Sequence, residues 1–204
     1  MMSGTANLTL SDEELQLVTR SQWILTKRVI MDKAVSLFGS LSEQLQELIK
    51  ATAGLPEEII HSVPKISKGE NYKGLPYVVL DHPRYFGKTD VLAMRTIFWW
   101  GNYFSVTLHL GGVYRQKYEA VLLGYLLQSD DDALHIFTGT DPWEHHFEDG
   151  NYLPVTGMEE AHLRSVTGTG NCIKLAYRYP LEEWEKIPSL VQERVAAWLQ
   201  LLLG

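Results

Sequence analysis

Residues 91–110 read VLAMRTIFWWGNYFSVTLHL, and this stretch decides the fold. The dipeptide Gly101-Asn102 separates two runs of strand-forming residues, which is typical of a tight β-hairpin. If these two residues form the turn, residues whose numbers add up to 203 face each other, and side chains alternate between the two faces of the sheet. The sequence therefore predicts an antiparallel sheet with this hairpin at its centre.

The predicted register gives the hairpin one apolar face and one mixed face. The mixed face carries aromatic rings, hydroxyl groups and His109, whereas Arg95 lies on the apolar face as its single charged side chain. A guanidinium removed from water needs a partner that offsets its lost hydration. We expect Arg95 to pair with an internal carboxylate or to reach water past the end of its strand. A ligand anion is the alternative partner.

Composition limits the fold and excludes several functions. A chain of 204 residues with 45% hydrophobic and 21% charged residues fits a single α+β domain, with a helical region at 1–62 and a sheet-containing body at 63–204. A formal net charge of -7 disfavours nucleic-acid binding. No apolar stretch has the roughly 20 residues of a membrane span, and the start has no signal-peptide pattern, so we expect a cytoplasmic protein that binds no membrane. The single cysteine, Cys172, excludes an intrachain disulfide, and we expect it to be a buried core residue.

Capping and periodicity signals predict helices on both sides of the sheet. Ser11 and Glu14 have the spacing of a capping box, and a helix is expected from about Ser21 to Phe38. Gly39 is expected to end it, with a second helix opening at Ser40. The further expected elements are a short helix from Pro56 to Ile60, a loop at 64–74, a strand ending at Pro83, a helix at 114–128, strands at 133–140 and 171–179, and a short helix at 158–164.

The last helix, residues 181–203, is expected to be kinked or split by Pro188. Its end is unusually apolar, and it must therefore be covered by the body of the same chain or by a second copy in a homodimer. Together these elements predict an α+β fold with an N-terminal helical layer packed on a largely antiparallel sheet and a C-terminal helix.

A first candidate site lies where the strand before the hairpin ends. Asp81-His82-Pro83-Arg84 combines side chains suited to acid-base chemistry and anion binding, although such a sequence is also a common turn. The aromatic side chain of Trp100 could stack on a planar ligand or fill the core. The candidate ligand-binding residues are His82, Arg84, Arg95, Trp100 and His109.

A second candidate site lies in the long segment 139–157, because loops of that length are often functional. Residues 143–148 read WEHHFE, and His145, His146 and Glu148 are residue types that bind divalent metals. Their spacing does not bring two histidines onto one helical face, so a metal site would need further ligands from elsewhere. The alternative is a solvated loop with incidental histidines.

The sequence leaves three function classes open. The leading hypothesis is the binding of a small anionic or partly aromatic ligand in a cleft beside the hairpin. The alternatives are a hydrolase-type enzyme that uses histidine and acidic residues, with or without a divalent metal, and an interaction protein or dimeric scaffold. Neither a dinucleotide nor a P-loop motif is present, since the glycines at 167–171 precede a strand, and we expect no cofactor.

Overall fold

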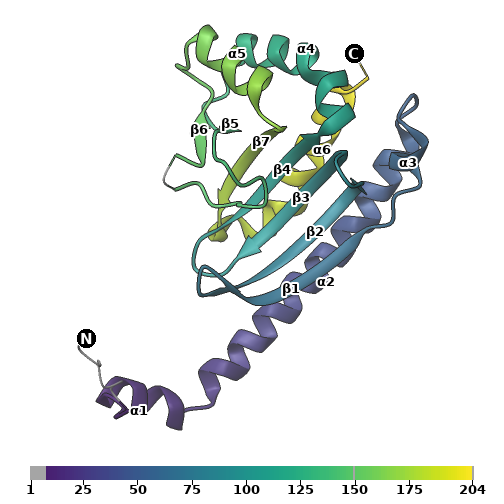
Figure 1. Ribbon diagram of the computed structural model, residues 1–204. Coiled ribbons are helices and arrows are strands. Elements are labelled where there is room, and N and C mark those ends of the chain that lie inside the picture. Colours follow the sequence, from purple (N-terminus) through teal and green to yellow (C-terminus); the bar gives the residue numbers. More distant parts are fainter. Residues whose placement is uncertain (1–7, 149, 204) are drawn as a thin grey trace.

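The computed structural model describes residues 8–148 and 150–203 and shows an α+β fold (Figure 1). In this part of the chain, seven strands form one antiparallel sheet with the order β1-β2-β3-β4-β7-β5-β6. The strands are β1 (Lys65–Tyr72), β2 (Leu75–Phe86), β3 (Val91–Trp99), β4 (Tyr103–Gly111), β5 (His135–Phe137), β6 (Tyr152–Pro154) and β7 (Cys172–Pro180). The predicted fold class is confirmed.

The central hairpin is present, but its register differs by one residue from the predicted one. Trp99 pairs with Tyr103, so three residues rather than two form the connection. Gly101 lies at the middle of this connection with φ of +70°, a conformation that glycine adopts without strain. The side chain of Asn102 donates a hydrogen bond to the Trp100 carbonyl. Facing residues therefore have numbers that add up to 202, as in the pair formed by Val91 and Gly111.

This shift moves all of β4 to the opposite face relative to β3. Arg95 now faces Thr107, and Ala93 faces His109. The prediction that Arg95 lies on an apolar face opposite His109 is therefore wrong, since the two side chains share the polar face of the sheet. The other face of the hairpin is made of buried apolar residues, among them Leu92, Met94, Phe104, Val106, Leu108 and Leu110.

Helices cover the apolar face and one end of the sheet (Figure 1). α2 and α6 pack against the apolar face, and α4 and α5 lie at the end of the sheet where β4 ends and β7 begins. The helices are α1 (Asp12–Thr19), α2 (Gln22–Ala51), α3 (Glu57–Ile60), α4 (Gly112–Gln128), α5 (Glu160–Thr169) and α6 (Ile187–Leu201), with a 3-10 turn η1 (Leu181–Lys186) before α6.

Two predictions in the N-terminal half are wrong. α2 is one continuous helix through Gly39 and Ser40, because a glycine inside a helix weakens it but does not end it when packing on both sides is favourable. The segment predicted as a loop at 64–74 contains strand β1. Its Lys, Ser and Asn residues are typical of an edge strand, where charged and polar side chains prevent pairing with other chains.

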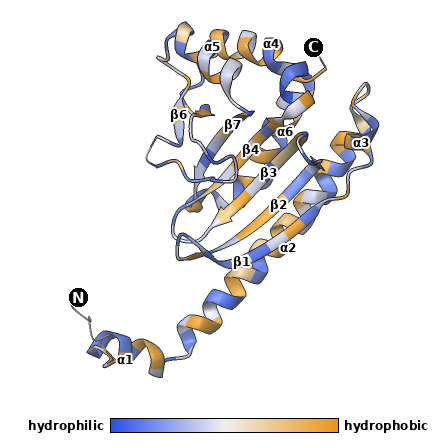
Figure 2. Ribbon diagram, viewed as in Figure 1, coloured by the Kyte–Doolittle hydropathy of each residue, from blue (hydrophilic) through white to orange (hydrophobic). Residues whose placement is uncertain are grey.

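The apolar C-terminus is covered by its own chain. Pro188 lies in the first turn of α6, so the expected split falls between η1 and α6. Val191, Val195, Trp198 and Leu199 are buried in the main core, which confirms docking against the body as the cover for this helix. Figure 2 shows apolar and polar residues alternating along the helices. No helix in the described ranges is both long and apolar enough to cross a membrane.

Candidate functional site

The face of the sheet that carries Arg95, His109 and Lys174 forms a layer of polar side chains, which we call the polar layer. It is built around an ion pair. The register of β2 and β3 places Asp81 opposite Arg95, and the two side chains form a bidentate contact, with Nε to Oδ1 at 2.6 Å and Nη2 to Oδ2 at 2.9 Å. Asp81 is 5% exposed. The internal carboxylate expected for Arg95 is therefore present, and this pair replaces much of the hydration that both groups lose.

The segment between β5 and β6, residues 138–151, covers this face, and its residue Asp149 lies outside the described residues. We call it the covering loop. Arg95 Nη1 lies 2.8 Å from His145 Nε2 of this loop. Because a guanidinium only donates hydrogen bonds, Nε2 must accept, and a neutral His145 then carries its proton on Nδ1. Nδ1 is buried and has no hydrogen-bond partner among the described residues.

Burial also sets the charge state of His145. Desolvation holds the pKa of this imidazole well below its ordinary value of 6.5, and the nearby charges of Lys174 and Arg95 lower it further. His145 is therefore neutral at physiological pH, with a buried N–H that lacks an acceptor in the described part of the chain. An unsatisfied buried donor of this kind costs about 1 to 3 kcal/mol.

Two tyrosines hold the covering loop against the sheet. The Tyr72 hydroxyl accepts hydrogen bonds from the backbone N–H groups of His145 at 2.8 Å and His146 at 3.1 Å, and it donates to Glu144 Oε2 at 2.9 Å. The Tyr103 hydroxyl accepts from the Phe147 N–H at 3.1 Å. These contacts give three loop amides an acceptor on the sheet, which positions His145 beside Arg95.

A second cation, Lys174, is fully buried under the same loop. Its Nζ donates to the carbonyl oxygens of Pro142 and Glu144, both at 2.8 Å, and it lies 4.4 Å from the centre of the Phe137 ring. Desolvation lowers the pKa of Lys174 to about 7. The layer therefore contains the part-buried guanidinium of Arg95 and the buried amine of Lys174, with the carboxylate of Asp81 paired to Arg95 and the carboxylate of Glu144 nearby.

His109 lies in the same layer. Its ring centre lies 5.6 Å from that of Trp143 in the covering loop. Burial lowers the pKa of His109 to about 3, and the charges of Lys174 and Arg95 contribute to this shift. Neither His109 nor His145 can take up a proton near pH 7, and burial raises the pKa of the Cys172 thiol. The layer is thus suited to donating hydrogen bonds and attracting negative charge rather than to transferring protons.

A cleft of about 160 Å³ opens onto this layer. Arg95 and His145 supply its polar groups, and Trp143, which is half-exposed, forms an outer wall with its ring centre 5.7 Å from the Arg95 guanidinium carbon. Arg95 uses three of its five N–H groups in contacts to Asp81 and His145, so two remain available among the described contacts. The lining residues are Tyr72, Tyr77, Val79, Arg95, Ile97, Trp143 and His145.

The structure does not bring the five predicted ligand-binding residues together. Arg95 and His109 lie in the same layer, but Trp100 lines a different groove on the helix-covered side of the sheet, with Phe98 and Trp184. His82 is buried, and burial lowers its pKa to about 4. Arg84 donates through Nε to the Val63 carbonyl. Neither His82 nor Arg84 lines the cleft.

The alternative metal site gains no support from the geometry. No group of three or more His, Cys, Asp or Glu side chains within residues 8–148 and 150–203 is arranged to hold a metal ion. The Nε2 lone pair of His145 accepts from Arg95, and His146 Nε2 lies 3.5 Å from Glu144 Oε2. The two imidazoles therefore contact Arg95 and Glu144, and the predicted ligands His145, His146 and Glu148 are not arranged as one metal-binding group.

Three residues of the layer were missed by sequence reasoning. Lys174 alternates with the core residues Ile173 and Leu175, so its position in the strand pattern indicated the polar face. Tyr72 lies in the segment interpreted as a loop, and Trp143 was noted only as part of the histidine motif. Comparison with known proteins found no matching family model, no similar curated protein and no similar solved structure.

Proposed function

We propose that the protein binds a small organic anion that carries one flat ring, in the cleft formed by Arg95, His145 and Trp143. The observation that carries this proposal is the combination of a guanidinium with free N–H groups and aromatic walls in one cleft. It retains the ligand class expected from the sequence but replaces most of the expected binding residues.

The charge of the layer supports a negatively charged ligand. The bidentate contact with Asp81 and the contact with His145 leave two N–H groups of the Arg95 guanidinium for a ligand. A negatively charged group would accept charge-assisted hydrogen bonds from them. A cationic ligand would instead be repelled by the guanidinium.

The walls of the cleft support a planar group, and its volume supports a small one. Tyr72, Tyr77 and Trp143 present ring surfaces, and such surfaces favour stacked or edge-to-face contacts with another ring. A volume of about 160 Å³ lies below the roughly 300 to 1,000 Å³ of pockets for drug-sized ligands. A single ring with one acidic group is the ligand class that fits both features.

Binding is favoured over the hydrolase alternative by the protonation states. A general base needs a pKa near the working pH, and His109 and His145 are far below it. Lys174 has a pKa near 7, but its amine is fully buried and occupied by two carbonyl groups. The groups at hand can therefore hold a ligand more readily than they can cleave one.

The test separates charge from ring shape with four probes: benzoate and salicylate carry both, benzamide carries the ring without the charge, and inorganic phosphate carries the charge without the ring. Isothermal titration and thermal denaturation of the full chain are expected to show saturable binding of benzoate or salicylate. Benzamide and phosphate are expected to bind at least tenfold more weakly. Equal binding of benzamide and benzoate, or no binding of any ring-bearing anion, contradicts the proposal.

The variant Trp143→Ala locates the site. Because Trp143 is half-exposed, its removal should leave the fold intact and weaken binding about three- to tenfold, the range that one aromatic contact contributes. Trp23→Ala, which removes a similarly exposed tryptophan far from the cleft, is the matched control and should leave affinity unchanged. Equal affinities of the wild type and Trp143→Ala would place any binding outside this cleft.

A further inference from the structure

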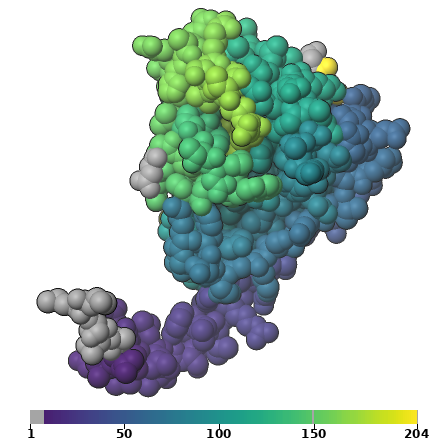
Figure 3. All heavy atoms as spheres, in the orientation of Figure 1, coloured from purple at the N-terminus to yellow at the C-terminus, as the bar shows by residue number. Residues whose placement is uncertain are grey.

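The N-terminal helices project from the body of the protein with a large apolar surface. Figure 3 shows α1 and the start of α2 extending beyond the compact part of the chain. We call residues 8–29 the arm. Its large apolar side chains are between 48% and 91% exposed. They are Leu8, Leu10, Leu15, Leu17, Val18, Trp23, Ile24, Leu25 and Val29.

The arm is an ordered helical unit. Ser11 and Glu14 form the predicted capping box at the start of α1, with both reciprocal hydrogen bonds present. Trp23 Nε1 donates to the Leu17 carbonyl at 2.9 Å, which ties α1 to α2 across the bend between them. The helical backbone that carries most of these apolar side chains is therefore formed before any partner binds, and less backbone entropy is lost on association.

The exposed surface of the arm continues the buried stripe of α2. Met31, Phe38 and Leu45 are buried and lie seven residues apart on the helix. Ile24 lies seven residues before Met31 on the same stripe, and it is 49% exposed even though Lys68 and Glu70 of β1 line the same pocket. A stripe with the pattern of a core face needs a cover of its own. The described residues cover this stripe only in part, since Ile24 and Leu25 remain about half exposed.

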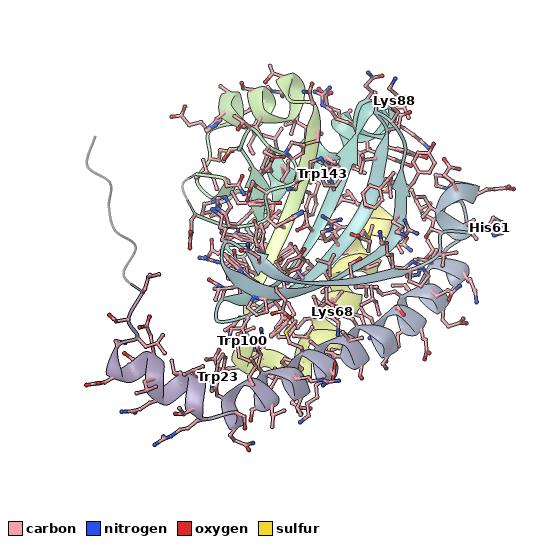
Figure 4. The ribbon with its side chains drawn as sticks, turned by 60° about the horizontal axis from the view of Figure 1, so that its bottom comes forward. Trp23, His61, Lys68, Lys88, Trp100 and Trp143 are labelled. Carbon is pink, nitrogen blue, oxygen red and sulfur yellow. The ribbon has the colours of Figure 1, made fainter. Side chains whose placement is uncertain are left out.

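An apolar groove lies next to the base of the arm. It has a volume of about 330 Å³, and Figure 4 shows its residue Trp100 at the same end of the molecule as Trp23. The arm cannot fill this groove in its own chain, because Ile30 in the groove and Trp23 belong to the same continuous helix and are separated by about 10 Å along its axis. The groove is lined by Ile30, Phe98, Trp100, Gly101, Leu181 and Trp184.

Charge favours a second copy of this chain as the partner. The arm begins with Asp12, Glu13 and Glu14 and continues with Arg20, Lys27 and Arg28, so it is neutral in a chain of net charge -7. Two antiparallel arms place the acidic end of one beside the basic end of the other. An anionic membrane surface would instead meet the acidic first turn of α1, unlike the cationic polar face of typical membrane-surface helices.

The available area reaches the threshold for a specific dimer. If each of the nine side chains loses roughly 60 Å² of exposed surface, two arms together remove about 1,000 Å² from water. This is the lower limit expected for a specific interface. We propose that the protein forms a twofold-symmetric homodimer in which the two arms pair antiparallel and each arm packs onto the apolar groove at Trp100 of the other copy.

The experiment is analytical ultracentrifugation of the full chain between about 1 and 100 µM. The wild type is expected to be a dimer in this range. The double variant Val18→Glu, Leu25→Glu is expected to be monomeric with an unchanged melting temperature, because both side chains lie outside the core. The matched control Val63→Glu, Val121→Glu places two charges on exposed apolar positions of the body and should remain dimeric.

Each other outcome overturns a defined part of the proposal. A wild type that is monomeric at 100 µM, or a dimer that persists in the arm variant, excludes the arm as the dimer contact. A monomeric wild type that cosediments with anionic phospholipid vesicles would show that the apolar surface of the arm binds lipid instead of a second copy. Dissociation in the arm variant together with undiminished dimerisation in Trp100→Ala would exclude the groove as the seat of the arm.

Discussion

Substitutions of Asp81 and Arg95 test how much of the free energy of unfolding depends on this one ion pair. Asp81→Asn removes the carboxylate and leaves the guanidinium buried, which should lower the free energy of unfolding by about 3 kcal/mol. In the double variant Asp81→Asn, Arg95→Gln, the loss should be smaller than the sum of the two single losses, because each single variant leaves one charge without its partner and the double variant leaves none. Urea denaturation measures both. The control Glu160→Gln, which removes an exposed ion pair, should cost less than about 0.5 kcal/mol, and additive losses would contradict the coupling.

Single residues also show how much of the site was accessible from the sequence. A buried carboxylate partner for Arg95 was predictable from the cost of isolating a guanidinium, and the strand alternation around Lys174 indicated its face. The contact between Arg95 and His145 was not predictable, because the two residues are 50 positions apart and the covering loop has no periodic pattern that fixes its path. Long-range loop contacts of this kind depend on the whole fold.

At the scale of single elements, the anchoring of the covering loop can be measured separately from the stability of the sheet. Tyr72→Phe removes the acceptor of the His145 and His146 amides, which should lower the free energy of unfolding by about 1 to 3 kcal/mol. Hydrogen exchange of these two amides should become faster, while amides in β3 and β4 keep their protection. Tyr85→Phe changes an exposed tyrosine and is the control. Unchanged exchange in the loop of Tyr72→Phe would show that the loop is held by other contacts.

Elements with a strong local signal were predicted, and those with a weak one were not. The capping box at Ser11, the hairpin and the helix at 114–128 follow from local pattern, and the structure has all three. The hairpin register failed because one additional residue in the turn, Trp100, changes which residues face each other while leaving the sequence pattern almost the same. The edge strand β1 failed because polar side chains at an edge resemble those of a loop.

For the protein as a whole, the buried titratable groups predict an unusual dependence of stability on pH. His82 and His109 have pKa values lowered to about 4 and about 3. Below pH 6.5 the unfolded chain therefore binds more protons at these sites than the folded chain does, and stability falls as the pH falls. Burial raises the pKa values of several tyrosines, including Tyr72 and Tyr152. Above about pH 10 the unfolded chain therefore loses protons that the folded chain keeps, and stability falls as the pH rises.

Between about pH 7 and 10, Lys174 is expected to control how stability depends on pH. Its pKa is about 7 in the folded chain and near its ordinary value of 10.5 in the unfolded chain, so between these pH values the unfolded state carries the additional proton. Stability should rise with pH there, by at most about 1.4 kcal/mol per pH unit, and reach its maximum at about pH 10 rather than near neutrality. Urea denaturation from pH 5 to 10 measures this slope. Lys174→Met should flatten it between pH 7 and 10 whatever its effect on stability at a single pH, and a slope that survives this change would assign the proton to another group.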